Sequence, residues 1–123
     1  MYTLDTNAII YYLKGDDAAL PVLRDVFAQP VSIYVSAVTE VELFSFSQLS
    51  EAEIGKIEYV LQTTSVIPLD SQIARIAGLL RRRHHLKTSD AVIAATAVFT
   101  GTFLVTRNIR DFQKIPDLKL LKI

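Results

Sequence analysis

Short apolar runs alternate along this chain with longer segments of helical spacing. Residues 2–4, 31–35, 66–67 and 103–105 are largely aromatic, β-branched or aliphatic, which predicts short strands buried on both faces. Residues 118–121 form a predicted last strand at the edge of the same sheet.

The segments between these strands have apolar stripes or capping residues that predict helices. Ser50 and Glu53 have the spacing of a capping box, and Thr88 or Ser89 is expected to cap the last helix. Strand–helix alternation predicts a single α/β domain over residues 1–123, a three-layer α/β/α sandwich around a parallel sheet of four to five strands. The predicted helices cover residues 8–13, 18–28, 36 to about 47, 50 to about 62, a segment starting at 70, and 90–99.

The composition excludes several kinds of site. The 123 residues suffice for one domain, and 50% hydrophobic with 21% charged residues is typical of a globular protein. Equal numbers of basic and acidic residues, 13 of each, argue against indiscriminate charge-driven binding of nucleic acid. The absence of cysteine excludes disulfides, zinc–thiolate sites and cysteine nucleophiles. The most apolar run is too short to span a bilayer, and the early first strand leaves no room for a signal peptide, so we expect a cytoplasmic protein.

Four acidic residues are expected at the carboxyl edge of the predicted sheet. Asp5 and Asp111 each follow a strand, and Asp90 opens the helix that leads into the second of these strands. Glu42 lies about one and a half turns beyond another strand. Ligands bind at this edge of open α/β sheets, so the four acids can surround one crevice. Clustered carboxylates repel each other, and a divalent cation with oxygen ligands, Mg²⁺ or Mn²⁺, removes that conflict.

Three of these acids also have an ordinary structural explanation. Asp5 or Asn7 can cap the helix that follows the first strand. Asp90 is favoured in a first helical turn by the helix dipole, by about 0.3–1 kcal/mol. Asp111 can be a simple turn residue. The functional interpretation therefore depends on all the acids meeting in one place.

Glu42 is the one acid expected within a helix. It shares a predicted face with Val38, Val41 and Ser45. An acid on an apolar stripe costs free energy unless it is paired or bound to a metal. The alternative is that Glu42 occupies a partly exposed position at the rim.

Four motifs occur in order along nearly the whole chain, from Tyr2 to Phe112. They are LDTN at Asp5, VEL at Glu42, TSDAVIAATAV at Asp90, and LVTRNIRDF at Asn108 and Asp111. In this combination they resemble the motifs of PIN-domain ribonucleases, and in particular those of VapC-type toxins from toxin–antitoxin modules.

The resemblance implies an endoribonuclease that uses Mg²⁺ or Mn²⁺ to cleave single-stranded or loop RNA. Many members of the family carry an acid where this chain has Asn108, which leaves open whether Asn108 or Asp111 completes the metal site; we expect Asp111. The implied catalytic and metal-binding residues are Asp5, Glu42, Asp90 and Asp111, with Thr6, Asn7, Thr106 and Asn108 in support.

The resemblance also implies two protein partners. One is a second copy of the chain in a homodimer, and the other is a cognate antitoxin whose tail occupies the acidic crevice. The apolar first helix and the helix pair over residues 36–62 offer the surfaces for these contacts.

One dense basic run and two further arginines are candidates for contacts with RNA phosphates. The alternative for the basic run is a solvated helix end, where cations suit the helix dipole. The candidate cations are Arg81, Arg82, Arg83, Lys87, Arg107 and Arg110.

Two other functions fit parts of the sequence. A phospho-acceptor module like response-regulator receivers has a similar length and acids at strand ends, but this chain lacks an acidic pair after the first strand and a Lys-Pro near the fifth. The other is a catalytically inactive PIN scaffold, against which the presence of all four acids argues.

Overall fold

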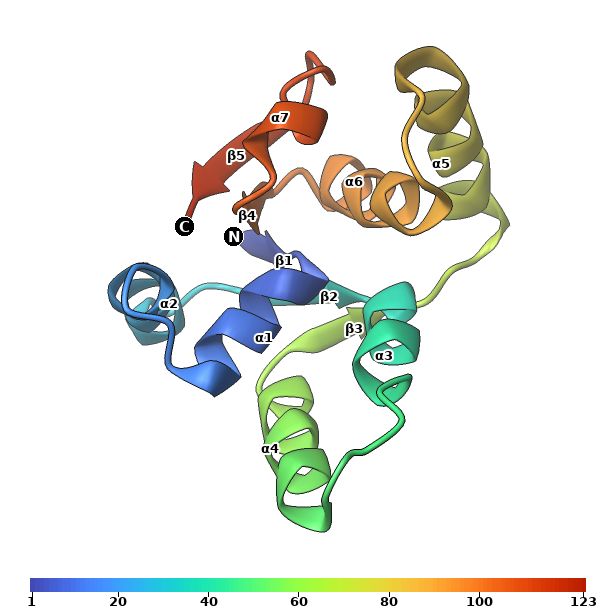
Figure 1. Ribbon diagram of the computed structural model, residues 1–123. Coiled ribbons are helices and arrows are strands. Elements are labelled where there is room, and N and C mark those ends of the chain that lie inside the picture. Colours follow the sequence, from blue (N-terminus) through green and yellow to red (C-terminus); the bar gives the residue numbers. More distant parts are fainter.

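The computed structural model describes residues 1–123 as five strands and seven helices (Figure 1). The strands pair in parallel in the order β3-β2-β1-β4-β5. The elements are β1 (Tyr2–Leu4), α1 (Thr6–Lys14), α2 (Ala19–Ala28), β2 (Ile33–Ser36), α3 (Ala37–Phe44), α4 (Glu51–Gln62), β3 (Ser65–Ile67), α5 (Ser71–His84), α6 (Thr88–Thr100), β4 (Phe103–Thr106), α7 (Ile109–Phe112) and β5 (Lys119–Lys122).

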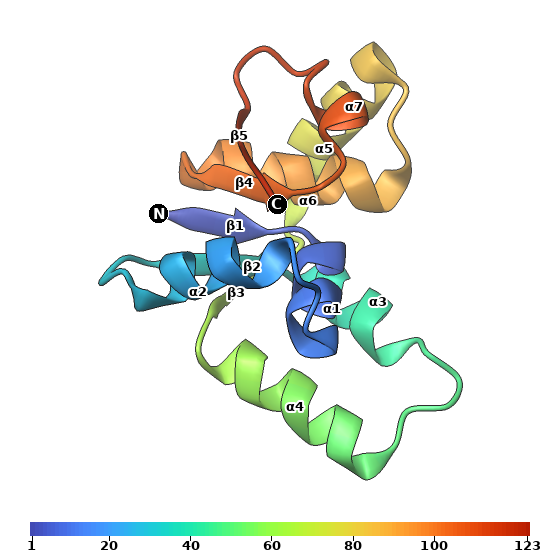
Figure 2. The ribbon, with the colours of Figure 1, turned by 60° about the vertical axis from the view of Figure 1, so that its left-hand side comes forward.

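Helices cover both faces of the sheet, which confirms the predicted three-layer α/β/α sandwich. Helices α1, α2 and α4 lie on one face, and α5 and α6 lie on the other (Figure 2). Adjacent strand residues point to opposite layers: Val105 belongs to the core under α1, α2 and α4, and Leu104 to the core under α5 and α6. The strands therefore have apolar side chains on both faces, as their composition predicted.

The chain changes direction across the sheet next to its central strand. Strands β2 and β3 are added on one side of β1, whereas β4 and β5 are added on the other side. The carboxyl ends of β1 and β4 are thus neighbours at a topological switch point, where open α/β sheets form their ligand crevice. Asp5 follows β1, and Thr106 ends β4.

Local capping explains most of the helix boundaries. Ser36 and Asp70 accept hydrogen bonds from the first turns of α3 and α5, and Ser50 forms the predicted capping box with Glu53. Helix α6 begins after Lys87, so the prediction of Thr88 or Ser89 as its cap is wrong.

Strand β2 covers Ile33–Ser36 rather than residues 31–35, and two helices also differ from the prediction. Helix α3 ends at Phe44, before the expected residue 47, and the hydroxyl of Ser45 donates to the carbonyl of Val41 at its end. Helix α7 forms where a polar turn was expected, because the side chain of Asn108 accepts the backbone N–H of Asp111 and caps one helical turn. No helix is both long and apolar enough to span a bilayer.

Candidate active site

Asp5 lies at the switch point and is nearly buried, with 5% of its surface exposed. Its backbone N–H donates to the carbonyl of Val105 at 3.1 Å, which extends the pairing of β1 with β4. Its carboxylate accepts a hydrogen bond of 2.7 Å from the hydroxyl of Thr106 and makes no capping bond to α1. Asp5 therefore occupies the N-cap position of α1, but its carboxylate is held by Thr106 at the end of β4.

Glu42 reaches the same place from α3. The hydroxyl of Thr6 donates to the Glu42 carboxylate at 2.7 Å and also lies 3.0 Å from the hydroxyl of Thr39. Thr39 is buried and Glu42 half-buried, whereas Val41 is exposed. The predicted apolar stripe through Val41 is therefore wrong, and Glu42 lies at the edge of the buried face, fixed by a hydroxyl.

Asp90 completes a group of three acids around one cavity. It lies in the first turn of α6 and is half-buried. Asp5, Glu42 and Asp90 line a cavity of about 430 Å³. The remaining lining residues are Thr6, Asn7, Ile10, Ser45 and Phe46.

The pKa values show that these acids affect one another. The pKa of Asp5 is raised from 3.8 to about 6, mainly by burial and further by the negative charges of Asp90 and Glu42, while the hydrogen bond from Thr106 opposes the rise. Burial and the charges of Glu42 and Asp111 also raise the pKa of Asp90, and Lys87 opposes this. The cavity therefore concentrates negative charge in a poorly solvated place.

The fourth acid, Asp111, lies outside the lining of this cavity. Its carboxylate accepts a hydrogen bond of 3.1 Å from the side-chain amide of Asn108 and lies 3.9 Å from the ammonium of Lys114. Asn108 thus orients the carboxylate through its NH₂ group. Its backbone N–H also donates to the hydroxyl of Thr106, which links this turn to Asp5.

The candidate RNA-binding cations divide into two groups. Arg81, Arg82, Arg83 and Lys87 are exposed around the connection between α5 and α6, and Arg110 is exposed on α7.

Arg107 differs, because its guanidinium pairs with Asp16 at 2.6 Å and lies 4.0 Å above the ring of Tyr11. It also donates to the carbonyl of Ile123. Arg107 therefore ties β4 to α1 and to the last residue, and much of its bonding capacity is used within the molecule.

Sequence reasoning did not assign the apolar part of the cavity wall. Ile10 and Phe46 both line the cavity, and Phe46 is 52% exposed. Ile10 is one helical turn beyond Asn7 on α1, so helical spacing was a usable signal for it. Phe46 lies in the turn after α3, whose path depends on where that helix ends.

The donor atoms of the cavity fit a hard divalent cation. In their present positions, no three acidic or histidine side chains lie together closely enough to enclose an ion. Mg²⁺, however, keeps several water ligands and binds proteins through one or two carboxylates, so it does not need a complete protein cage. Carboxylates with raised pKa values, without a cation paired to Asp5, are the electrostatic environment such an ion stabilises.

A family model for the PIN domain matches residues 2–118. The chain belongs to the PIN-domain family. Among curated proteins, Ribonuclease VapC19 of Mycobacterium tuberculosis is 30% identical over 97% of this chain and 98% of its own length. The tRNA(fMet)-specific endonuclease VapC of Salmonella typhimurium is 27% identical over 97% of this chain and 95% of its own length.

Solved structures show the same relationship for this PIN domain. The structure of VapBC2 from Rickettsia felis, bound to a DNA fragment from its promoter, superposes with a TM-score of 0.84 at 27% identity. The match covers 99% of this chain and 98% of that one. A toxin–antitoxin complex from Klebsiella pneumoniae gives a TM-score of 0.82 at 28% identity, with both chains fully covered. The chain is therefore of the VapC type, and the receiver-like alternative is wrong.

Proposed function

We propose that this PIN-domain protein is an endoribonuclease dependent on Mg²⁺ or Mn²⁺, which cleaves single-stranded or loop RNA as the toxin of a toxin–antitoxin pair. Its relatives named as ribonucleases support the reaction class, and the VapBC complexes support the toxin role. The metal requirement is supported by the acids of the cavity.

The observation that carries this proposal is the mutual effect of three carboxylates in one cavity. Asp5 is nearly buried, and the charges of Asp90 and Glu42 add to the rise of its pKa. Such an arrangement costs folding free energy, because burial and like charges both disfavour the ionised forms. A divalent cation among them would replace the repulsion between the carboxylates with attraction to the metal. Metal binding is therefore a functional reason for keeping these acids together.

Each residue of the site has a role that its contacts support. Asp5, Glu42 and Asp90 would hold the cation, which supplies Lewis-acid stabilisation of the charge that develops on the phosphate. Thr106 holds Asp5 at 2.7 Å and Thr6 holds Glu42 at 2.7 Å, so both carboxylates are oriented before substrate arrives. This preorganisation matters because a displaced ligand loses much of its contribution to the rate.

Asp111 is the proposed fourth carboxylate, with Asn108 as its positioning residue. The amide of Asn108 fixes the orientation of Asp111, and the charge of Asp111 already affects the pKa of Asp90. Asp111 would act on water or substrate around the cation from outside the lining of the cavity.

The surface beside the cavity suits the tail of an antitoxin. A groove of about 470 Å³ runs between α1, α3 and α4 and shares Ile10 and Phe46 with the acidic cavity. Apolar residues, among them Leu13, Leu43 and Ile57, form half of its lining. A peptide with an apolar segment followed by a cation would fill the groove and neutralise the acids. We expect the homodimer as well, to be checked by light scattering.

The proposal is tested by RNA cleavage with purified protein. We expect cleavage with Mg²⁺ or Mn²⁺, loss of cleavage in excess EDTA, and recovery when the metal is restored. Undiminished cleavage in EDTA would contradict the metal requirement. No cleavage of any single-stranded or loop RNA with either metal would instead support the inactive PIN scaffold.

A further inference from the structure

The connection between α5 and α6 carries cations without acidic neighbours in the sequence. No acid occurs between Asp70 and Asp90. Both ion pairs of the molecule lie elsewhere, so none of these cations forms a salt bridge, and only Lys87 is close enough to an acid to lower its pKa, that of Asp90. We call the group the cationic junction; its members are the exposed residues Arg81, Arg82, Arg83 and Lys87.

The cationic junction adjoins the acidic cavity. Lys87 is the last residue before α6, and its carbonyl accepts the backbone N–H of Ala91 at 2.9 Å, so it belongs to the first turn of the helix that carries Asp90. Lys87 and Asp90 are three positions apart in the chain, which limits their Cα separation to about 11 Å. A polymer phosphate next to one bound in the cavity therefore falls within reach of Lys87, and the three arginines precede Lys87 by four to six residues.

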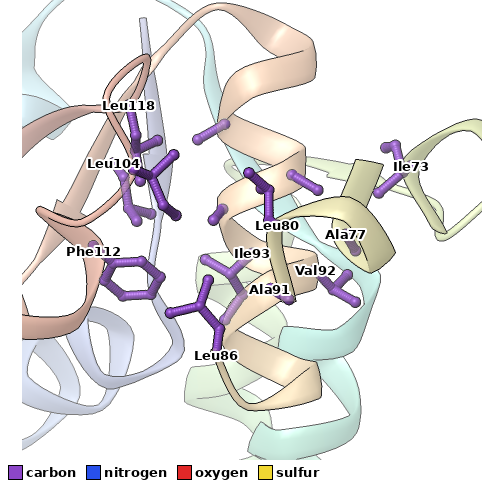
Figure 3. Close-up of a cluster of buried hydrophobic side chains, with 14 residues drawn as sticks. Ile73, Ala77, Leu80, Leu86, Ala91, Val92, Ile93, Leu104, Phe112 and Leu118 are labelled. Carbon is purple, nitrogen blue, oxygen red and sulfur yellow. The ribbon is translucent and has the colours of Figure 1, made fainter. Parts of the chain in front are cut away.

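The junction is held rigidly with respect to Asp90. Leu80 precedes it, Leu86 lies within it, and both are buried in the same cluster as Ala91 and Ile93 of α6 (Figure 3). Between them the backbone of His85 turns through the left-handed region at a φ of 56°, which ends α5 sharply. The cations and Asp90 thus stand on one packed core.

The other side of the site offers no comparable charge. Arg107 is occupied by Asp16 and Tyr11, and residues 110–117 contain two basic and two acidic residues. The acids of the cavity repel RNA, and the chain has no overall positive charge to compensate. Attraction of the phosphate backbone must therefore come from a local group of cations, and the junction is the densest run of exposed cations in the chain.

We propose that the cationic junction binds the RNA phosphates that flank the scissile one, so that the single strand leaves the cavity over the α5–α6 connection. This inference rests on the proposed ribonuclease function and adds the path of the substrate. The arginines supply charge and hydrogen bonds to the backbone, which fit any sequence.

The test is binding of a fluorescent oligouridine by fluorescence anisotropy in excess EDTA, where cleavage is absent. We expect the triple variant R81Q/R82Q/R83Q to bind at least about tenfold more weakly at moderate salt. The slope of log K against log salt should fall by about 2, because each phosphate contact to a single strand contributes about 0.7. The matched control R24Q/R75Q/K119Q removes three exposed cations elsewhere and should bind like the wild type.

Two further variants keep the test decisive. R81K/R82K/R83K retains the charges and should keep most of the salt slope. If a circular dichroism melt shows that the triple variant does not fold, K87Q replaces it and should lower the slope by about 0.7. The proposal would be overturned if the folded triple variant and the control bound RNA with equal affinity and equal salt slope. It would also be overturned if the triple variant lost binding of the antitoxin but not of RNA. Junction-dependent binding by a wild type that cleaves no RNA would retain the junction and contradict the ribonuclease function instead.

Discussion

Two acidic turns at the carboxyl edge of the sheet are held in different ways. Asp5 is nearly buried, its carboxylate is held by the hydroxyl of Thr106, and it has no cation beside it. Asp111 has 40% of its side chain exposed, accepts the amide of Asn108, and lies near Lys114. We therefore expect an added cation to have its largest effect at Asp5, because burial there disfavours the ionised carboxylate.

The largest expected effect is the loss of activity on removing the buried charge. Asp5→Asn keeps the shape and an acceptor for Thr106, but it removes a proposed ligand. We expect the cleavage rate to fall at least about a hundredfold, equivalent to roughly 3 kcal/mol of transition-state stabilisation. Single-turnover cleavage at saturating Mg²⁺ measures this rate. A smaller loss of rate in Asp5→Asn than in Asp111→Asn would contradict the greater importance of the buried carboxylate.

The second prediction concerns stability without divalent cations. The folded state holds the Asp5 proton up to a pKa of about 6, whereas the unfolded chain releases it near 3.8. Stability from this group is therefore present below the unfolded pKa and is lost as pH rises through the folded pKa. Asp5→Asn should exceed the wild type in unfolding free energy at neutral pH by up to about 3 kcal/mol and match it near pH 4.

Urea unfolding in EDTA at both pH values measures this difference. Asp111→Asn serves as the control, since its more exposed carboxylate leaves the unfolding free energy nearly unchanged by the substitution. A variant at Asp5 that is less stable than the wild type at neutral pH would show that burial of this charge is not costly.

The third prediction separates the hydroxyl of Thr106 from its packing. Thr106→Val removes the donor to Asp5 and the acceptor for the backbone of Asn108, whereas Thr106→Ser retains both. Loss of the donor raises the pKa of Asp5 further, so we expect Thr106→Val to need about tenfold more Mg²⁺ for half-maximal cleavage. Mg²⁺ titrations of the two variants check this; equal midpoints would show that the hydroxyl plays no part.

The smallest effects are expected at the exposed turn. Asp111→Asn should lower the cleavage rate and raise the Mg²⁺ concentration at half-maximal activity several-fold. Asn108→Ala should change both quantities less, since it only frees the Asp111 carboxylate to rotate. Both are measured by the same Mg²⁺ titration. If Asp111→Asn changes neither quantity while Asn108→Ala abolishes cleavage, Asn108 and not Asp111 belongs to the site.

Much of the fold was predictable because its signals are local. The apolar residues 2–4 and 103–105 identify two central strands, and Ser50 with Glu53 identifies a helix start. The placement of Asp5, Glu42 and Asp90 around one crevice followed from the carboxyl-edge rule for parallel sheets and the family resemblance.

The remaining features depend on contacts between residues far apart in the chain. The hydrogen bond from Thr106 to Asp5 joins residues 101 positions apart, and the pairing of Arg107 with Asp16 spans 91. The spacing of residues along the chain gives no signal for such a contact, so the sequence alone predicts Arg107 as one of the RNA-binding cations. The end of α3 was misplaced because Ser45 can either continue a helix or bond back to it.

The central claim is that the buried carboxylates bind a divalent cation. Electron paramagnetic resonance of free Mn²⁺, measured while the metal is titrated into the protein, counts bound ions independently of cleavage. We expect saturable binding to the wild type, strong weakening in Asp5→Asn, and a smaller effect in Asp111→Asn. Equal Mn²⁺ binding by the wild type and Asp5→Asn, or none by either, would contradict the claim.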